Sequence, residues 1–257
     1  MKWMKRSLPA ACLLLCFLLL LPACAHDNYS DEMKIPYSAD LDDSAGADAV
    51  ERQGDHPDST YFTSPDVYNM KSTYSLTVLH HFRTQQQTSE WSCGESAALM
   101  VLDWYGKLGD WNEASLAALR HPLNQADYNG YPGTTLLQEM DIFKGVGGFA
   151  LTTTYDKPEG LSPEEIRQYL AAGDPILICW NTWGGHWMVI IGYDTMGTET
   201  TLDDVLITAD PYDTSDHNQD GYVLYGAERV LENFTTFNIF TEDEGGNDNL
   251  FIVAVPE

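Results

Sequence analysis

Basic side chains are scarce in this sequence. Its 257 residues include 13 Lys and Arg against 39 Asp and Glu, a formal net charge of −26 at pH 7. Three of the bases, Lys2, Lys5 and Arg6, lie at the very start, so without residues 1–23 the chain keeps 10 bases and 39 acids, a charge of −29. Such a surface repels nucleic acid and anionic lipid and favours cationic substrates or divalent metal. We therefore expect no nucleic-acid partner; solubility of an exported protein is the simpler interpretation of the charge.

Cysteine is also rare, with five residues in the whole chain. Cys12 and Cys16 lie in an apolar N-terminal run, and Cys24 ends it. Exported domains usually pair their cysteines as disulfides, and Cys93 and Cys179 could pair. However, Cys179 lies in "PILICWN", an apolar run typical of a buried strand, where cysteine acts as a small hydrophobe. Cys93 is then a free thiol outside the cytoplasm, which indicates a function.

The apolar run near the N-terminus is too short for a comfortable membrane span. It follows basic residues and ends in Leu21-Pro22-Ala23-Cys24, as in a secretory signal. This ending resembles the lipobox of bacterial lipoproteins. The resemblance implies removal of residues 1–23, lipid on Cys24, and anchoring to the outer face of the bacterial cell membrane. The alternative is a plain signal peptide with an incidental cysteine.

The rest of the chain divides into a tether and one domain. Residues 24–74 are acidic and poor in large apolar side chains, which predicts a flexible tether. Residues 75–257 suit a single domain without internal repeats, and we expect a monomer. Strand-like "SLTVLHHF" opens this domain. The predicted helices are 94–105, 111–120, 133–145 and 162–173, the last with Ser162 as cap, Pro163 at its first position and Gly173 as terminator. The predicted strands are 176–180, 187–193, 205–208 and 251–255. Helices followed by strands favour an α+β fold.

Cys93 precedes the most apolar of these helices, where exposed amides and the helix dipole stabilise a thiolate. A nucleophile also needs a base. Among seven histidines, His186 stands out because it follows Gly184-Gly185 and begins a strand. A structural histidine is the alternative interpretation for it, and a stronger one for the other histidines. These are His26 and His56 in the tether, His80 and His81 in the first strand, and His121 and His217 in loops.

A third group would orient the imidazole. "HWMVIIGYD" and "DDVLITADPYD" flank a segment rich in turn formers, which predicts an antiparallel hairpin. Centring the turn on Thr198 pairs His186 with Asp210 and puts Asp194 at the far end of the ladder. Asp213 is the candidate if the loop is lopsided. The Cys93 amide and one of Gln85, Gln86 or Gln87 could donate hydrogen bonds to an oxyanion.

Gln87 six positions before Cys93 in "QTSEWSCG", the apolar helix, the Gly-His-Trp strand and the Asp-Pro together resemble the papain-like cysteine peptidases of the bacteriocin-processing (double-glycine) group. The resemblance covers roughly residues 75–257. It implies a papain-like fold with Cys93 as nucleophile, His186 as base, Asp210 as orienting group and Gln87 in the oxyanion hole. Glu95 departs from the Pro or Ala of many relatives and puts an acid near the thiolate. No transporter span or ATP-binding signature accompanies the domain, so the leader-cleaving exporter role is not implied.

Aromatic residues and a possible metal loop complete the candidates. Trp91, Trp183 and Trp187 flank the predicted site; we expect Trp91 and Trp187, with Gly185, to bind substrate, and Trp180 to pack in the core. Core packing is the alternative for all of them. Asp216, Asn218, Asp220 and Gly221 follow the spacing of a calcium loop, although Ala227 stands where its last ligand belongs. An Asx-rich turn is the alternative, and we expect no other cofactor.

The sequence thus predicts a cell-surface cysteine peptidase that hydrolyses peptide bonds of a peptide or protein substrate through a Cys-His-Asp triad and a thioester. Two alternatives stay open. One is a catalytically weakened peptide-binding module of the same fold. The other keeps the chemistry and acts on cell-wall peptides, as an amidase or a transacylase.

Overall fold

The structure is a computed structural model. It describes residues 31–36, 61, 63, 65–123, 133–182, 184–213, 220–234 and 240–257. The predicted signal segment, the predicted lipidation site Cys24, most of the tether and three predicted site residues lie outside the described residues; those three are Trp183, Asp216 and Asn218.

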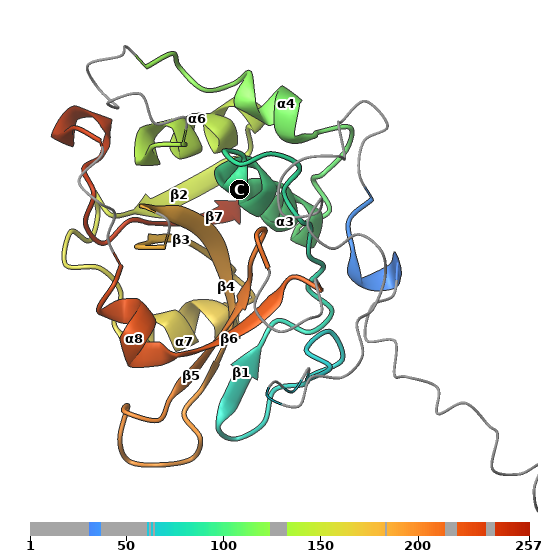
Figure 1. Cartoon of the computed structure of the whole chain (residues 1–257), viewed down its shortest axis with the longest axis vertical. Helices are drawn as coiled ribbons and strands as arrows, with labels where there is room; N and C mark the ends of the chain where they lie inside the picture. Colours follow the sequence, from blue (N-terminus) through green and yellow to red (C-terminus); the bar gives the residue numbers. More distant parts are fainter. Residues whose placement is uncertain are drawn as a thin grey trace, which may run out of the picture.

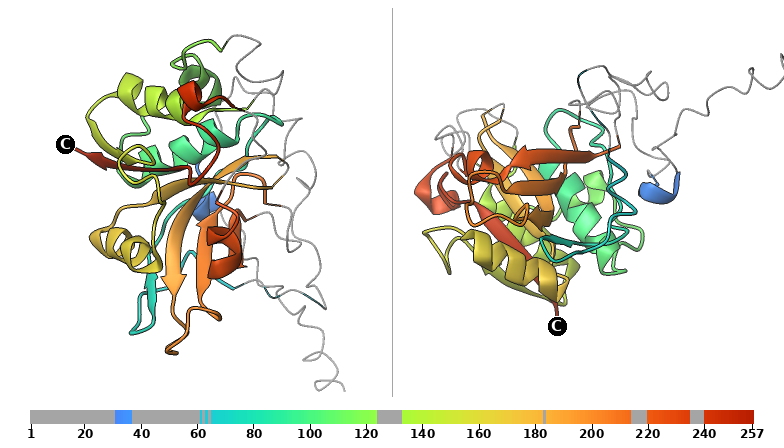
Figure 2. Two further views of the ribbon diagram at one scale, coloured as in Figure 1. Left: turned by 90° about the vertical axis from the view of Figure 1, so that its left-hand side faces the viewer. Right: turned by 90° about the horizontal axis from the view of Figure 1, so that it is seen from below.

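The described strands form one antiparallel seven-stranded sheet in the order β2-β7-β3-β4-β5-β6, with β1 paired to β4. The strands are β1 Leu76–Val78, β2 Phe149–Thr153, β3 Ile176–Trp180, β4 His186–Asp194, β5 Val205–Ala209, β6 Tyr222–Gly226 and β7 Phe251–Pro256. Helices α3, α4 and α6 gather at one end of the molecule, and the β4–β5 hairpin extends away from them (Figures 1 and 2). This is the papain-like α+β fold expected from the sequence.

The helices are α3 Cys93–Trp104, α4 Glu113–Ala117, α6 Leu136–Val146, α7 Pro163–Ala172 and α8 Ala227–Leu231, with 3-10 turns η1 Asp31–Met33 and η2 Glu242–Glu244. Helix α7 begins after Ser162 and ends before Gly173, which adopts a left-handed conformation, as its cap residues predict. Helix α3 is buried along ten residues from Cys93 to Leu102 and packs on β4 and α6. This packing brings the start of α3 and the sheet together.

Some elements differ from the sequence prediction. Strand β1 stops at Val78, so His80 and His81 lie in a turn, where His81 takes a positive φ of 63°. Strand β2, strand β6 and helix α8 were not predicted. Their sequences are short, and the side chains of β6 change from buried to exposed without the alternation of a half-buried strand. These elements depend on their partners β7 and β5.

The register of the predicted hairpin is also different. Asp194 pairs with Val205 at the turn end, and beyond a β-bulge at Ile191 the ladder finishes with Val189 opposite Ala209. His186 and Asp210 are therefore not paired across the ladder, contrary to the prediction. The turn is centred between Glu199 and Thr200 and not on Thr198, and the bulge adds one residue to β4.

Two parts of the predicted tether contact the domain. Residues 31–36 lie along the segment before the site, with Ile35 N donating to Thr84 O at 2.9 Å and Thr84 N donating to Met33 O at 2.9 Å. Met33 and Ile35 are buried, as are Val67 and Tyr68. Burial of these four apolar side chains offsets the chain entropy that is lost when these positions are held against the domain.

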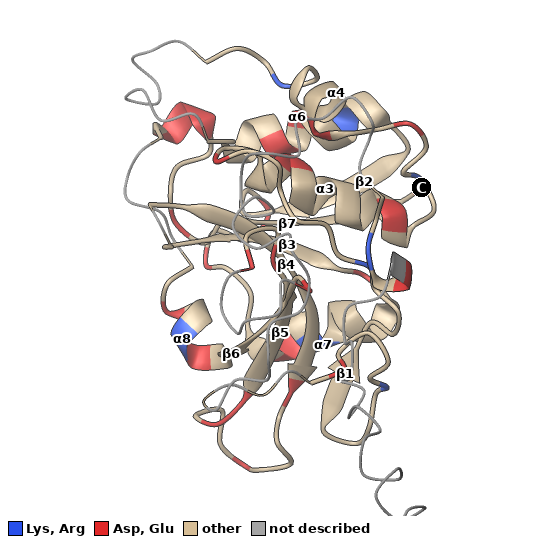
Figure 3. Ribbon diagram, turned by 45° about the vertical axis from the view of Figure 1, so that its right-hand side comes forward, with Lys and Arg blue, Asp and Glu red and all other residues tan. Residues whose placement is uncertain are grey.

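Acidic side chains outnumber basic ones along the described ribbon (Figure 3). None of the helices in the described part of the chain has the length and hydropathy needed to cross a bilayer.

Candidate active site

Cys93 is the first residue of α3, and its thiol is free and 8% exposed. The preceding Ser92 makes no side-chain cap to the helix. The Glu95 carboxyl instead accepts a hydrogen bond from its own backbone N–H in the first turn. The start of a helix favours negative charge, so this position suits a thiolate.

His186 begins β4 and is 3% exposed. Its Nε2 lies 2.6 Å from Asp210 Oδ1, so the ring donates to the carboxylate. A second hydrogen bond joins the imidazole to the Cys93 thiol. The structure therefore brings the predicted Cys93, His186 and Asp210 into one chain of contacts.

The pKa of His186 is raised to about 10. Burial is the largest influence and by itself lowers this pKa, but it is outweighed by the charge and the hydrogen bond of Asp210 and by the contact with Cys93. The ring is therefore positively charged at neutral pH. A charged imidazolium beside Cys93 stabilises a thiolate.

Contacts at both its carboxylate and its backbone hold Asp210 in place. Tyr212 N donates to Oδ1 at 2.8 Å, the Tyr225 hydroxyl lies 3.5 Å from Oδ2, and Asp210 N donates to Gly221 O at 2.8 Å. Asp213, the fallback candidate, accepts from Gly221 N at 3.0 Å. It thus fixes the loop after β5, whereas Asp210 holds the imidazole.

Of the three predicted glutamines, Gln87 lines the pocket that contains Cys93 and His186. Its Nε2 donates to Ser89 O at 2.6 Å, and its backbone N donates to Pro211 O at 2.7 Å. An amide nitrogen carries two hydrogens, so one remains for a bound oxyanion. Gln86 has a different role: its side chain joins Asp210 O and Asp213 N at 3.2 and 3.1 Å.

The pocket is lined by Gln87, Glu90, Cys93, Gly185, His186 and Tyr212. Gly184 and Gly185 have φ angles of 94° and 147°, which side-chain-bearing residues rarely adopt. The glycine pair therefore leads the chain into β4 through a backbone conformation that favours glycine. Glu90 and Tyr212 were not predicted; their closeness in sequence to Cys93 and Asp210 is the signal that could have found them.

The tryptophans lie differently from the prediction. Trp187 is 1% exposed and donates from Nε1 to Thr134 O at 2.8 Å, so it belongs to the core and not to a substrate groove. Trp187 is buried because it lies within β4, on which helix α3 packs. Trp91 packs under the Arg120 guanidinium, 5.1 Å from the ring centre. Its contact with substrate stays a prediction. Trp180 is buried, as expected for a core residue.

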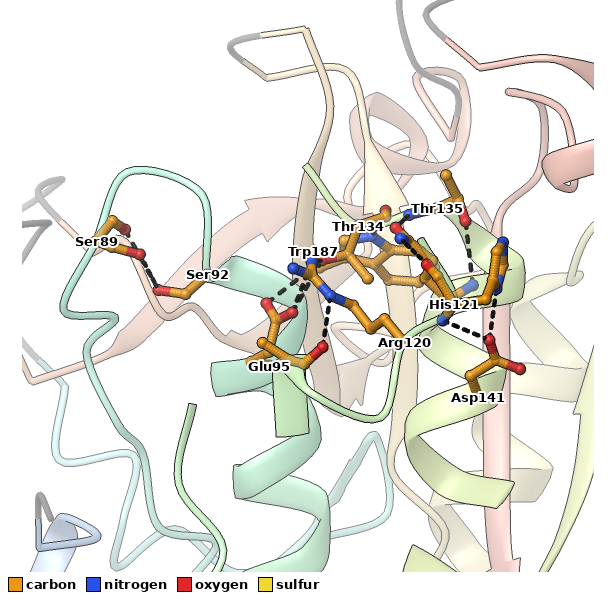
Figure 4. A network of polar contacts seen from close by, with 11 residues as sticks. Ser89, Ser92, Glu95, Arg120, His121, Thr134, Thr135, Asp141 and Trp187 are labelled. Atoms are coloured by element: carbon orange, nitrogen blue, oxygen red, sulfur yellow. Dashed lines mark hydrogen bonds and ion pairs between the residues drawn. The ribbon is translucent and has the colours of Figure 1, made fainter. Parts of the chain in front are cut away.

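A polar cluster around Glu95, two residues after Cys93, includes Arg120 and Thr134 (Figure 4). Glu95 Oε1 pairs with Arg120 Nη1 at 2.8 Å, and the Thr134 hydroxyl lies near both residues. Burial raises the pKa of Glu95 to about 7, and Arg120 opposes that rise. The acid expected to oppose thiolate formation is therefore offset by a neighbouring cation.

Glu139 on α6 adds a second carboxyl to this cluster. It is 0% exposed, and neither carboxyl oxygen has a hydrogen-bond partner among the described residues. Burial, and then the neighbouring Glu95 and Cys93, raise its pKa well above the ordinary value. Its Oε2 lies so close to Gly94 that a Cβ there would meet it at 2.6 Å. Glu139 is therefore a neutral acid packed against the residue after Cys93.

Glu113 anchors the loop that carries Gln87. This buried carboxylate accepts from Thr88 N at 3.0 Å, from the Thr88 hydroxyl at 2.8 Å and from the Ser96 hydroxyl at 2.7 Å. One side chain of α4 thus fixes both the loop before α3 and the first turn of α3.

The calcium prediction is not tested. Of its ligands, Asp220 is described, and its Oδ1 accepts from Tyr222 N at 2.9 Å. The described residues contain no group of three or more His, Cys, Asp or Glu side chains placed to hold a metal.

Comparison with known proteins identifies the family of this chain. The model of the Peptidase_C39 like family matches residues 79–237, which is more than half of the chain and includes Gln87, Cys93, His186 and Asp210. None of the curated proteins matches the sequence significantly. On the match to residues 79–237, the chain belongs to the Peptidase_C39-like family, and its relationship is to cysteine peptidases.

Proposed function

We propose that this protein is a cysteine peptidase that hydrolyses peptide bonds with Cys93 as nucleophile, through a thioester. The observation that carries the proposal is the chain of contacts from Asp210 through His186 to Cys93, of which His186 and Cys93 line one pocket. Membership of a peptidase-like family supports it.

The first half-reaction forms the thioester. The Cys93 thiolate attacks the carbonyl carbon of the substrate, and the carbonyl electrons move to its oxygen. The Cys93 N–H and the free N–H of Gln87 Nε2 hold that oxyanion. When it collapses, the C–N bond breaks, and the imidazolium of His186 gives its proton to the leaving amine. Asp210 keeps the ring oriented throughout.

The second half-reaction releases the acid. Neutral His186 takes a proton from a water molecule as its oxygen attacks the thioester carbonyl carbon. The oxyanion forms again in the same position, and its collapse breaks the C–S bond. The products are the carboxylic acid and the Cys93 thiolate beside a charged His186, which restores the initial state.

Mass spectrometry of a proteome-derived peptide library tests this proposal. Wild type should cleave a subset of peptides, and Cys93→Ala should lower cleavage by at least about 10³-fold. Cys179→Ala is the matched control, because burial raises the pKa of Cys179 well above its usual range and leaves that thiol unreactive. Iodoacetamide at neutral pH should label Cys93 and spare Cys179. Full cleavage without Cys93 would rule out the mechanism. Release of cell-wall fragments without peptide cleavage would favour the amidase alternative.

The proposal includes export and a lipid anchor on Cys24. Its support is the sequence of residues 1–24, in which basic residues precede an apolar run and Leu-Pro-Ala-Cys. Mass spectrometry of the mature N-terminus should find Cys24 as the first residue, carrying lipid. In detergent phase partitioning, Cys24→Ser should move the protein to the aqueous phase. A mature N-terminus at another residue would contradict the anchor.

A further inference from the structure

Two side chains in the active-site pocket have no part in the proposed chemistry. Glu90 lies in the loop before α3, and Tyr212 lies in the loop after β5. The Tyr212 hydroxyl is 3.3 and 3.2 Å from the two Glu90 carboxylate oxygens. The pair therefore connects the two loops beside Cys93 and His186.

Tyr212 holds Glu90 in a defined place. Its backbone N donates to Asp210 Oδ1, the oxygen that also receives the His186 N–H. Burial, and then the charge and hydrogen bond of Glu90, raise the pKa of Tyr212, so its hydroxyl stays protonated and donates to the carboxylate. The position of Glu90 is thus tied to the orientation of the catalytic imidazole.

Glu90 gives the pocket a negative charge. It is exposed, and it is the one acid among the described residues that line the pocket, which include no Lys or Arg. The positive charge of His186 is already balanced by Asp210 and Cys93. In the described part of the chain no lysine or arginine forms an ion pair with Glu90; Arg83, the base nearest in sequence, pairs with Asp103, and Arg120 pairs with Glu95.

We propose that Glu90 selects substrates with a lysine or arginine next to the scissile bond. The inference rests on the proposed peptidase function and names its substrate class. A cationic side chain would form a charge-assisted hydrogen bond with Glu90, and its stem would lie along the Tyr212 ring. The charge of −26 on the whole chain would add attraction at longer range.

Paired peptides test the inference. Once the library has given a cleaved sequence, internally quenched peptides carry Lys, Arg, Gln or Glu at each position flanking the scissile bond. For wild type, kcat/KM at the preferred position should be about tenfold to a hundredfold higher with Lys or Arg than with Gln, the range of a hydrogen bond to a charged group. Glu90→Gln should remove most of this preference, and Glu90→Lys should reverse it in favour of Glu.

Two further variants separate a local effect from a general one. Glu159→Lys makes the same change of charge at an exposed loop residue and should keep the wild-type preference. Tyr212→Phe keeps the ring but removes the hydroxyl that holds Glu90, and it should weaken the preference by a smaller factor than Glu90→Gln. If Glu159→Lys alters the Lys-to-Glu ratio as much as Glu90→Lys does, the inference is wrong.

Alkylation of Cys93 gives a readout that needs no hydrolysis. A cationic reagent, (2-bromoethyl)trimethylammonium, is compared with anionic iodoacetate, each relative to neutral iodoacetamide. The cation-to-anion ratio of rates should fall in Glu90→Gln and fall further in Glu90→Lys; an unchanged ratio overturns the inference. Cys93-dependent cleavage without a charge preference overturns the inference alone. Absence of any cleavage by wild type overturns the proposed function, and the choice of substrate with it.

Discussion

His186 Nε2 lies 2.6 Å from Asp210 Oδ1, although both residues lie beyond the last backbone pair of the β4–β5 ladder, Val189–Ala209. The link is therefore made by side chains and not by strand pairing. Its geometry depends on the loop after β5, where Tyr212 N holds the same carboxylate oxygen. The orientation of the imidazole is set by that loop as much as by the sheet.

Asp210→Asn should lower the pKa of His186, because it removes the charge that keeps the ring protonated up to about pH 10. In wild type the raised pKa contributes stability that is complete below about pH 6.5 and is lost as pH rises through 10. The alkaline limb of kcat/KM should move to lower pH in the variant, and kcat/KM should fall by about 10- to 10³-fold. Asp213→Asn is the control, since Asp213 bonds Gly221 N. An unmoved alkaline limb would contradict the assigned role of Asp210.

Glu139→Gln should reduce the loss of stability with rising pH. Glu139 stays protonated in the fold at pH values where it ionises in the unfolded chain, above about 4.5. Its contribution to stability is therefore present at low pH and is lost as pH rises towards its raised pKa. The fall in melting temperature from pH 5 to pH 8 should be smaller in the variant than in wild type. Glu164→Gln, at an exposed site on α7, should follow wild type. Equal falls in all three proteins would mean that Glu139 is ionised in the fold.

Gly94→Ala should destabilise the fold by about 1–3 kcal/mol and lower activity, because the new methyl group overpacks a buried site. Its Cβ would meet Glu139 Oε2 at 2.6 Å and Thr134 at 3.0 Å. Thermal unfolding and kcat/KM measure the two effects. Gly133→Ala is the matched control, since its Cβ would make ordinary contact with Phe240 at 3.7 Å. Adding Glu139→Ala to Gly94→Ala should restore part of the stability. Purely additive losses in the double variant would argue against this contact.

Glu113→Gln should loosen the loop that carries Gln87. The neutral amide replaces a carboxylate that accepts three hydrogen bonds from Thr88 and Ser96. A loss of about 1–3 kcal/mol in stability is expected for weakened bonds to a buried charge. Hydrogen exchange in residues 85–92 should quicken, and kcat should fall more than KM rises, because Gln87 acts on the oxyanion in the proposed mechanism. Unchanged exchange in that loop would show that other contacts fix it.

The sequence by itself determined the main elements and the candidate residues Cys93, His186, Asp210 and Gln87. Helix α7 was predicted to the residue because Ser162, Pro163 and Gly173 are local signals that act within one turn. Cys93 and His186 could be selected because a thiol at a helix start and a histidine after a glycine pair are visible along the chain. Asp210 came from the predicted hairpin, and Gln87 came from the family resemblance. His186 contacts Asp210 although the predicted strand register was wrong, because a side chain can reach past the end of a ladder.

Tertiary structure alone decided what surrounds those residues. Trp187 is in the core because α3 packs on β4, and the charge of Glu95 is offset because Arg120 comes from a different segment. Glu139 likewise lies beside Glu95, 44 positions earlier in the chain, and the Glu90–Tyr212 pair joins residues 122 positions apart. Burial and electrostatic environment depend on which distant elements pack together, and neither composition nor periodicity specifies those neighbours.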